Sequence, residues 1–182
     1  MKTVLSAIVF ITFAVSGSGC GLLFTNVKPV DEKSKNYRIA ELDKENQDWV
    51  KLEPTTNNGS GPAQSSDISD IAYQSKQTSS IISLNSACRI QAASDSLDMI
   101  THELTLGVTD ISQHEQKNIE VSGLPALQTT LQGKLGGEPM AMQTVVLKKE
   151  SCTYDMIYVS RPNHFAEQQA DFSHFVTSLH LK

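Results

Sequence analysis

The sequence lacks an apolar run long enough to cross a bilayer as a helix. A transmembrane helix needs roughly 20 apolar residues, whereas the apolar stretch that begins at Val4 ends at Val15. This length excludes a spanning helix there and is typical of the hydrophobic part of a signal peptide.

Motifs that would indicate an enzymatic activity are also missing. The sequence contains no C-x-x-C, no H-E-x-x-H and no G-x-S-x-G pattern, which would indicate a redox pair, a zinc site or a serine nucleophile. Gly133 to Gly137 lie between two expected strands, where a hairpin turn explains them better than a phosphate loop. We therefore expect a protein that is not an enzyme and has no cofactor.

The histidines do not follow a metal-binding spacing. His174 and His180 are the nearest pair, and six positions on a helix would place them on opposite faces. We expect all of the histidines at the surface and no metal site: His102, His114, His164, His174 and His180.

Positive charge is scarce. Lys and Arg number 15 against 20 Asp and Glu, and loss of Lys2 with a leader would leave 14 against 20, a net charge near −6. An acidic protein attracts neither nucleic acid nor anionic lipid headgroups. We therefore expect no nucleic-acid partner, and a membrane link that depends on an attached lipid.

The N-terminus has the order of features found in an exported precursor. Lys2 gives a basic start, the apolar stretch follows, and Ser16 to Gly19 supply small residues before Cys20. This arrangement resembles a bacterial lipoprotein signal, which implies that residues 1–19 are removed and that Cys20 is lipidated. Lipoprotein signals prefer Leu or a similar apolar residue three positions before the cysteine, where this sequence has Gly17. Ordinary secretion with cleavage near Gly19 therefore stays open as an alternative.

The mature chain divides into a short tether and one domain. Gly21 after Cys20 implies, by the enterobacterial sorting rule, a position on the periplasmic face of the outer membrane. Residues 20–36 are mostly polar and predict a lipidated tether. Residues 37–182 are long enough to bury a core and predict a single α+β domain.

Apolar periodicity predicts the elements of this domain. Met156 to Val159 are apolar on both faces, which predicts a central strand covered on both sides and hence an α/β/α sandwich around an antiparallel sheet. Segments 37–42 and 49–52 are expected to form two short strands or one irregular hairpin. The other expected strands are 68–76, 79–90, 117–121, 124–132, 140–149 and 152–160, and the expected helices are 97–108 and a C-terminal one ending near residue 179. Met140 and Met142 alternate toward one face as core residues, and Asp155 is expected at a solvated strand edge.

The order of these segments resembles lipoproteins with a PsbP-like fold. The residues that carry the resemblance are Asp70-Ile-Ala-Tyr73, the strand with Cys88, Val121-Ser-Gly-Leu-Pro-Ala126, Cys152-Thr-Tyr-Asp155 and the stretch from Phe172 to Leu179. The family is named for the extrinsic subunit of the photosystem II oxygen-evolving complex. The resemblance implies an antiparallel sheet between helices and a role in protein binding or assembly, and it carries over no catalytic or metal-binding residue.

Cys88 and Cys152 remain as an even pair once Cys20 is lipidated. In an oxidising compartment such a pair favours a disulfide. Two buried free thiols and a metal or redox site are the alternatives, and the missing C-x-x-C pattern counts against the last.

Two functions follow from these features. The favoured one is a non-catalytic, membrane-anchored envelope lipoprotein that binds an envelope protein or assists an assembly. The alternative is a lipoprotein that binds a small ligand in a pocket between sheet and helices, lined by residues such as Tyr154, Tyr158 and Phe172. An apolar pocket would favour the ligand, whereas a filled interior with an exposed apolar patch would favour a protein partner.

Overall fold

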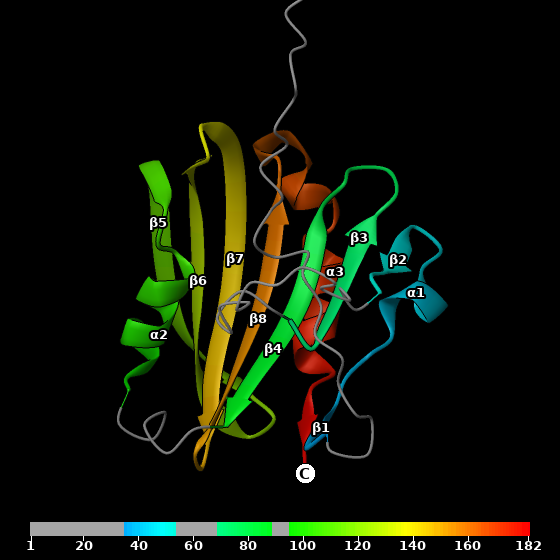
Figure 1. Ribbon diagram of the computed structural model, residues 1–182, viewed down its shortest axis with the longest axis vertical. Coiled ribbons are helices and arrows are strands. Elements are labelled where there is room, and N and C mark those ends of the chain that lie inside the picture. Colours follow the sequence, from blue (N-terminus) through cyan, green and yellow to red (C-terminus); the bar gives the residue numbers. More distant parts are fainter. Residues whose placement is uncertain (1–34, 54–68, 89–94) are drawn as a thin grey trace, which may run out of the picture.

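A computed structural model describes residues 35–53, 69–88 and 95–182, which form an antiparallel sheet flanked by helices (Figure 1). Seven strands pair in the order β2-β3-β4-β8-β7-β6-β5, and β1 pairs separately with β9. The strands are β1 (Tyr37–Arg38), β2 (Trp49–Lys51), β3 (Ile71–Ser75), β4 (Ile81–Cys88), β5 (Val108–Val121), β6 (Leu124–Leu135), β7 (Glu138–Lys149), β8 (Cys152–Ser160) and β9 (His180–Leu181). The helices are α1 (Leu42–Glu45), α2 (Leu97–Leu104), α3 (Gln169–Thr177) and the 3₁₀ helix η2 (Pro162–Glu167).

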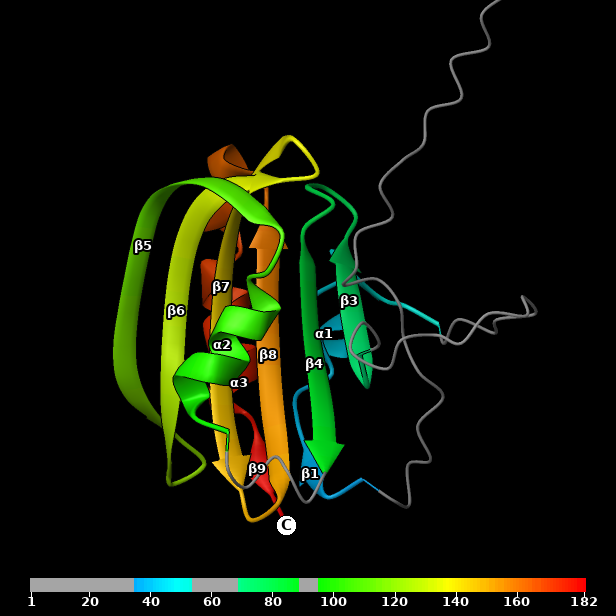
Figure 2. The same cartoon turned by 60° about the vertical axis from the view of Figure 1, so that its left-hand side comes forward.

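Strand β8 lies at the centre of the sheet, as its apolar sequence predicts. It pairs with β4 on one side and β7 on the other, and Thr153 to Ser160 are all buried. Figure 2 shows α2 and α3 on opposite faces of the sheet. The α+β class and the three-layer arrangement are therefore confirmed.

Each face of the sheet has its own core. The larger core, on the α3 side, includes Phe172, Phe175 and Val176 of that helix. The smaller core, on the α2 side, consists of Leu131, Met140, Met142, Ile157 and Val159. The prediction that Met140 and Met142 fill the core is confirmed.

The β6–β7 hairpin turns at the predicted glycines. Gly136 and Gly137 have φ of 61° and 89°, in the left-handed region that favours glycine. The hairpin interpretation of this glycine-rich segment is confirmed.

Two predicted boundaries around α2 are wrong. The helix ends at Leu104, short of residue 108, and β5 begins at Val108, well before residue 117. Residues 111–118 of this edge strand are all exposed, so neither face of β5 is covered there. Such a strand shows no alternation of apolar and polar residues, so the pattern used for the prediction is absent.

Gly133 of β6 lies where β5 approaches most closely. A Cβ added at Gly133 would lie 2.7 Å from the backbone oxygen of Thr109 and 2.9 Å from Val108 Cγ1. These contacts coincide with the irregular register of β5 between Thr109 and Gln113. The bulge therefore requires glycine on the neighbouring strand.

We expect Gly133→Ala to lower the free energy of unfolding by about 1–3 kcal/mol, because the added methyl group would displace the backbone of β5. Urea denaturation measures this change. Gln132→Ala, at the half-exposed neighbouring position, is the control and should change stability by less than about 0.5 kcal/mol. Equal stability of Gly133→Ala and the wild type would contradict the close approach.

Candidate functional site

The structure contains the disulfide that the sequence favours. Cys88 ends β4, Cys152 begins β8, and the two lie opposite each other in the strand register with an S–S distance of 2.06 Å. Asn36 Nδ2 lies 3.8 Å from Cys88 Sγ and 3.6 Å from Cys152 Sγ. Cys20, the predicted lipidation site, lies outside the described residues.

The residues proposed to line a ligand pocket fill the core instead. Tyr158 stacks on Phe172 with ring centroids 5.7 Å apart, and its hydroxyl donates to the Phe165 backbone oxygen over 2.9 Å. Tyr154 packs edge-on against Tyr37 at 6.3 Å. Burial raises the pKa of both Tyr154 and Tyr158, so these phenols stay neutral.

The histidines lie at or near the surface. His174 Nε2 lies 2.7 Å from Glu45 Oε2, and His164 Nδ1 lies 2.9 Å from Glu167 Oε1. His180 falls in β9, beyond the end of α3. Across the described ranges, no group of three or more His, Cys, Asp or Glu is placed to hold a metal ion.

The expectation for Asp155 is wrong. Its side chain is buried in β8, on the face opposite Tyr154, and Asn85 Nδ2 donates to its oxygens over 3.4 and 3.3 Å. In the sequence alone, the carboxylate of Asp155 suggests a strand edge that faces water. In the fold, β4 pairs with β8 although it is distant in sequence, so Asp155 lies inside the sheet.

A buried polar network near the start of α3 escaped the sequence analysis. Gln168 Nε2 donates to Asp48 Oδ2 over 2.8 Å and to Ser75 Oγ over 2.7 Å, and Ser75 Oγ donates to Asp48 Oδ2 over 2.7 Å. Gln168 caps the start of α3 and Ser75 ends β3. Their hydrogen bonds to each other and to Asp48 therefore hold the start of α3 against β3. No sequence pattern marks a set of residues that lie so far apart along the chain.

Large apolar side chains are exposed near both edges of the sheet: Val50 of β2 at one edge, and three residues in and beside β5 at the other. Met99 of α2 is 53% exposed, Leu106 after that helix is 60% exposed, and Ile111 of β5 is 51% exposed. We name these three residues the α2–β5 patch. Figure 2 shows α2 on one face of the sheet, with the chain continuing from it into the edge strand β5. An exposed group of this kind is typical of a protein-binding surface.

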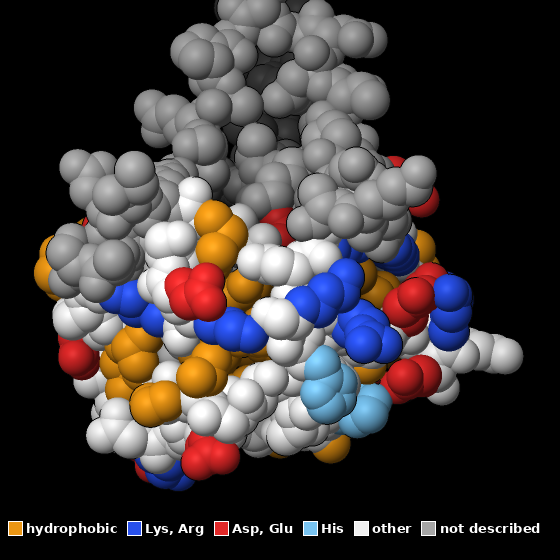
Figure 3. Space-filling view, turned by 90° about the horizontal axis from the view of Figure 1, so that it is seen from below, with side chains coloured by type: hydrophobic (Ala, Val, Ile, Leu, Met, Phe, Trp, Pro, Cys, Tyr) orange, Lys and Arg blue, Asp and Glu red, His pale blue; other side chains and the backbone are white. Residues whose placement is uncertain are grey.

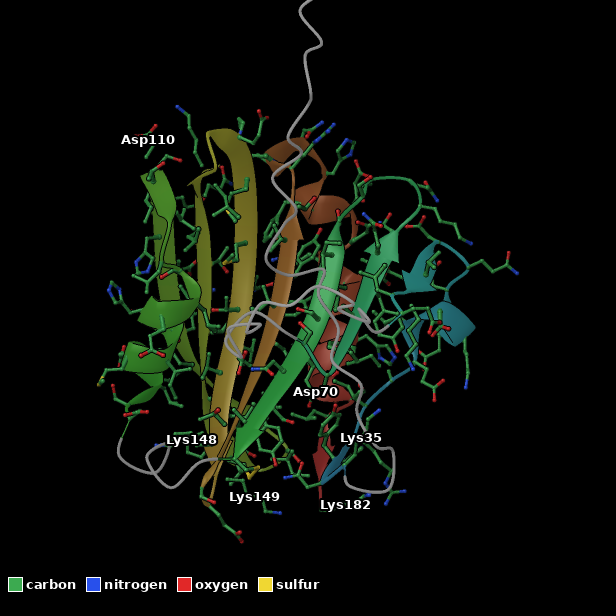
Figure 4. The ribbon with its side chains drawn as sticks, viewed as in Figure 1. Lys35, Asp70, Asp110, Lys148, Lys149 and Lys182 are labelled. Carbon is green, nitrogen blue, oxygen red and sulfur yellow. A yellow bond between two sulfur atoms is a disulfide. The ribbon has the colours of Figure 1, made fainter. Side chains whose placement is uncertain are left out.

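Lysines gather at one end of the domain. Figure 4 shows Lys35, Lys148, Lys149 and Lys182 at the same end, and we name these four residues the lysine end. Seen from that end, Lys and Arg form an interrupted band with Asp and Glu beside it (Figure 3). Basic and acidic side chains therefore lie side by side on this face.

Main-chain oxygens position these lysines, and the one on Lys182, the last residue of this chain, is a carboxylate oxygen. Lys149 Nζ donates to the Lys182 oxygen over 2.5 Å, and Lys182 Nζ donates to the Lys35 oxygen over 2.8 Å. Lys148 Nζ donates to the Asp95 oxygen over 2.6 Å. The pairing of β1 with β9 brings the first and last of these residues together.

The fold is PsbP-like. The structure is similar to LpqN, described as involved in cell envelope biogenesis of Mycobacterium tuberculosis, with a TM-score of 0.55, 13% identity, and coverage of 80% of this chain and 83% of that chain. It is also similar to cyanobacterial PsbP (CyanoP) from Synechocystis sp., with a TM-score of 0.51, 10% identity, and coverage of 85% and 91%. No model of a known protein family matches the sequence, and no curated protein matches it.

The helices in the described parts of the chain are too short or too polar for any of them to cross a membrane.

Proposed function

We propose that this protein is a non-catalytic lipoprotein of the bacterial cell envelope, held by lipid on Cys20, which binds a partner protein through the α2–β5 patch. The observation that carries the proposal is the contrast between the buried Tyr154, Tyr158 and Phe172 and the exposed Met99, Leu106 and Ile111. The signal-like N-terminus supports export and anchoring, and Gly21 supports the outer membrane. The description of LpqN as a protein of envelope biogenesis supports the compartment.

The α2–β5 patch has the physical properties of a contact surface. Burial of a Leu or Ile side chain contributes about 1.5–3 kcal/mol, so covering Leu106 and Ile111 would supply a useful share of a binding energy. The patch lies beside an edge strand, and edge strands offer backbone groups for further pairing. A protein segment satisfies both features, whereas a small ligand would need a hollow.

The anchor is tested by metabolic labelling with a palmitate analogue. We expect the wild-type protein to be labelled and recovered with membranes, and Cys20→Ala to be unlabelled and unprocessed. A Ser18→Ala variant, which keeps a small residue near the cut, is the control and should be labelled normally. An unlabelled wild type in the aqueous fraction would overturn the anchor.

The partner surface is tested by photo-crosslinking in the native envelope. A photoreactive amino acid at Leu106 is expected to capture a defined protein, while the same probe at exposed Ser173 on α3 should not. Ile111→Asp should reduce the Leu106 crosslink by about tenfold, because it places a charge in the contact. Equal products from both probes, or a small molecule co-purifying in stoichiometric amount, would overturn the proposal.

A further inference from the structure

We propose that two copies of this chain pair through the exposed edge of β5, so that their two sheets join into one. The segment concerned is 113–119, which follows the bulge, whereas Ile111 of the α2–β5 patch lies within the bulge. The inference adds a second interface to the proposed function and depends neither on the lipid anchor nor on the partner protein. Three observations carry it: the open edge of β5, its charge pattern, and the short opposite edge of the sheet.

The open edge of β5 offers backbone groups for pairing. The strand has 14 residues, and among the described strands it pairs only with β6 (Figure 2). From Gln113 to Val121 its register with β6 is continuous, so the strand is regular beyond the bulge. In an antiparallel ladder, alternate residues direct their N–H and C=O groups to opposite sides of the strand. Every second residue of 113–119 therefore presents both groups outward, where another strand can pair with them.

Two opposite charges lie at the middle of this edge. Glu115 and Lys117 are two positions apart in β5, so their side chains share one face of the sheet. Lys117 Nζ lies 2.9 Å from Glu115 Oε1, and the two side chains are 59% and 51% exposed. Both groups are therefore accessible to charges on a strand that pairs with β5.

This charge pattern is complementary to itself in one register. When Gln116 lies opposite Gln116 of a second copy in an antiparallel pair, Glu115 of each copy lies opposite Lys117 of the other. Side chains directly opposite each other share a face of the sheet and interact. The pairing thus forms opposite-charge pairs on both sides of the two-fold axis, in addition to the backbone hydrogen bonds.

The neighbouring registers are disfavoured because they bring like charges together. Outward-directed backbone groups must meet outward-directed groups, so a two-fold pair of identical strands always places one residue opposite its own copy. The adjacent allowed registers are centred on Glu115, which then faces Glu115, or on Lys117, which then faces Lys117. Like charges directly opposite each other are destabilising. The alternation of Glu115, Gln116 and Lys117 therefore selects the register centred on Gln116.

The other edge of the sheet is too short to extend the pairing further. It is formed by β2, which has 3 residues (Trp49–Lys51). A contact that uses the same segment in both copies closes as a dimer. Charged side chains and bulges commonly protect an edge strand from unlimited pairing. In β5, the bulge before Gln113 and the charges at Glu115 and Lys117 would restrict pairing to a single partner in a single register.

Such a dimer presents two α2–β5 patches on one side. The two-fold axis of an antiparallel strand pair runs perpendicular to the sheet, so the α2 helices of both copies cover the same face of the joined sheet. A partner with two binding sites would bind two patches more tightly than one, without any new kind of contact. The dimer therefore adds bivalency to the protein-binding role.

Photo-crosslinking of the full-length chain in bacterial cells tests the pairing. A photoreactive amino acid at Gln116 is expected to give a covalent dimer, in which mass spectrometry finds the probe joined to residues 114–118 of a second copy. The same probe at Val50 of β2, which is 42% exposed at the opposite edge, should give no dimer. Absence of a dimer from Gln116, or capture of a different protein there, would overturn the inference.

Charge reversal at the edge tests the register. Glu115→Lys and Lys117→Glu each convert the opposite-charge pairs into like-charge pairs, so each variant should lower the dimer-to-monomer ratio by about tenfold. Glu115→Lys combined with Lys117→Glu exchanges the two charges and restores the pairs, so this double variant should crosslink as the wild type does. Equal melting temperatures would show that the variants, which alter exposed side chains, are folded.

Coexpression of the two single variants gives the decisive comparison. In a mixed pair, each lysine of the Glu115→Lys copy lies opposite a glutamate of the Lys117→Glu copy, so mixed dimers should exceed the dimers of either variant alone by about tenfold. An epitope in the β6–β7 turn of one copy distinguishes the mixed product. Unchanged dimers in the single variants, or no recovery in the double variant and the mixture, would overturn the register. The Leu106 probe reports the partner surface separately, so either interface can fail without the other.

Discussion

Replacing both Cys88 and Cys152 by Ala is expected to lower the free energy of unfolding by about 4 kcal/mol. The two cysteines are 64 residues apart in sequence, and opening the bridge restores the conformational freedom of that long segment to the unfolded chain. The cysteines join the ends of β4 and β8, the pair that supports the centre of the sheet. Urea denaturation of the folded domain measures the change.

Reduction of the wild type provides an independent check of this value. Dithiothreitol should lower the stability of the wild type by a similar amount and leave the double variant unchanged. Ser151→Ala, at the exposed neighbour of Cys152, should change stability by less than about 0.5 kcal/mol. A loss below about 1 kcal/mol in the double variant would show that the bridge does not constrain the unfolded chain.

Phe172→Ala is expected to cost about 3–5 kcal/mol, the usual result of deleting a fully buried aromatic side chain. Phe172 lies in the larger core and stacks on Tyr158, with ring centroids 5.7 Å apart. Loss of the ring would leave a cavity between α3 and the sheet and remove the stacking contact of that helix with Tyr158 of β8. Thermal and urea denaturation both measure the effect.

The adjacent residue provides the matched control. Ser173 is exposed on the same helix, so Ser173→Ala keeps the helical backbone and should be nearly neutral. Phe172→Leu, which retains most of the buried volume, should recover more than half of the loss. Similar stability of Phe172→Ala and Ser173→Ala would mean that the side chain is not part of the core.

The parts of this fold that can be predicted are those in which burial or a turn is marked by neighbouring residues in the sequence. Met156 to Val159 are apolar at every position, so the central strand was recognisable, and the glycine pair after β6 marked its turn. Residues 111–118 of β5 have both faces in water and carry no such pattern. Asp155 was misjudged because its burial depends on β4, which lies far from it in sequence.

The lysine end could not be predicted, for a different reason. Lys35 and Lys182 are separated by 147 positions and meet only because β1 pairs with β9. Net charge averages over the whole chain, so it indicated an acidic protein with no attraction to headgroups. The distribution of charge is a property of the folded topology, which neither composition nor spacing records.

The meeting of the two ends of the domain has a practical consequence for labelling it. The Lys182 backbone N–H donates to the Asn36 oxygen over 2.8 Å, so a fluorescent protein fused after Lys182 would sit beside the tether. Such a fusion would crowd the β1–β9 pair that joins the two ends of the domain. An epitope inserted in the β6–β7 turn at Gly136 and Gly137, at the far end of the sheet, avoids that interference.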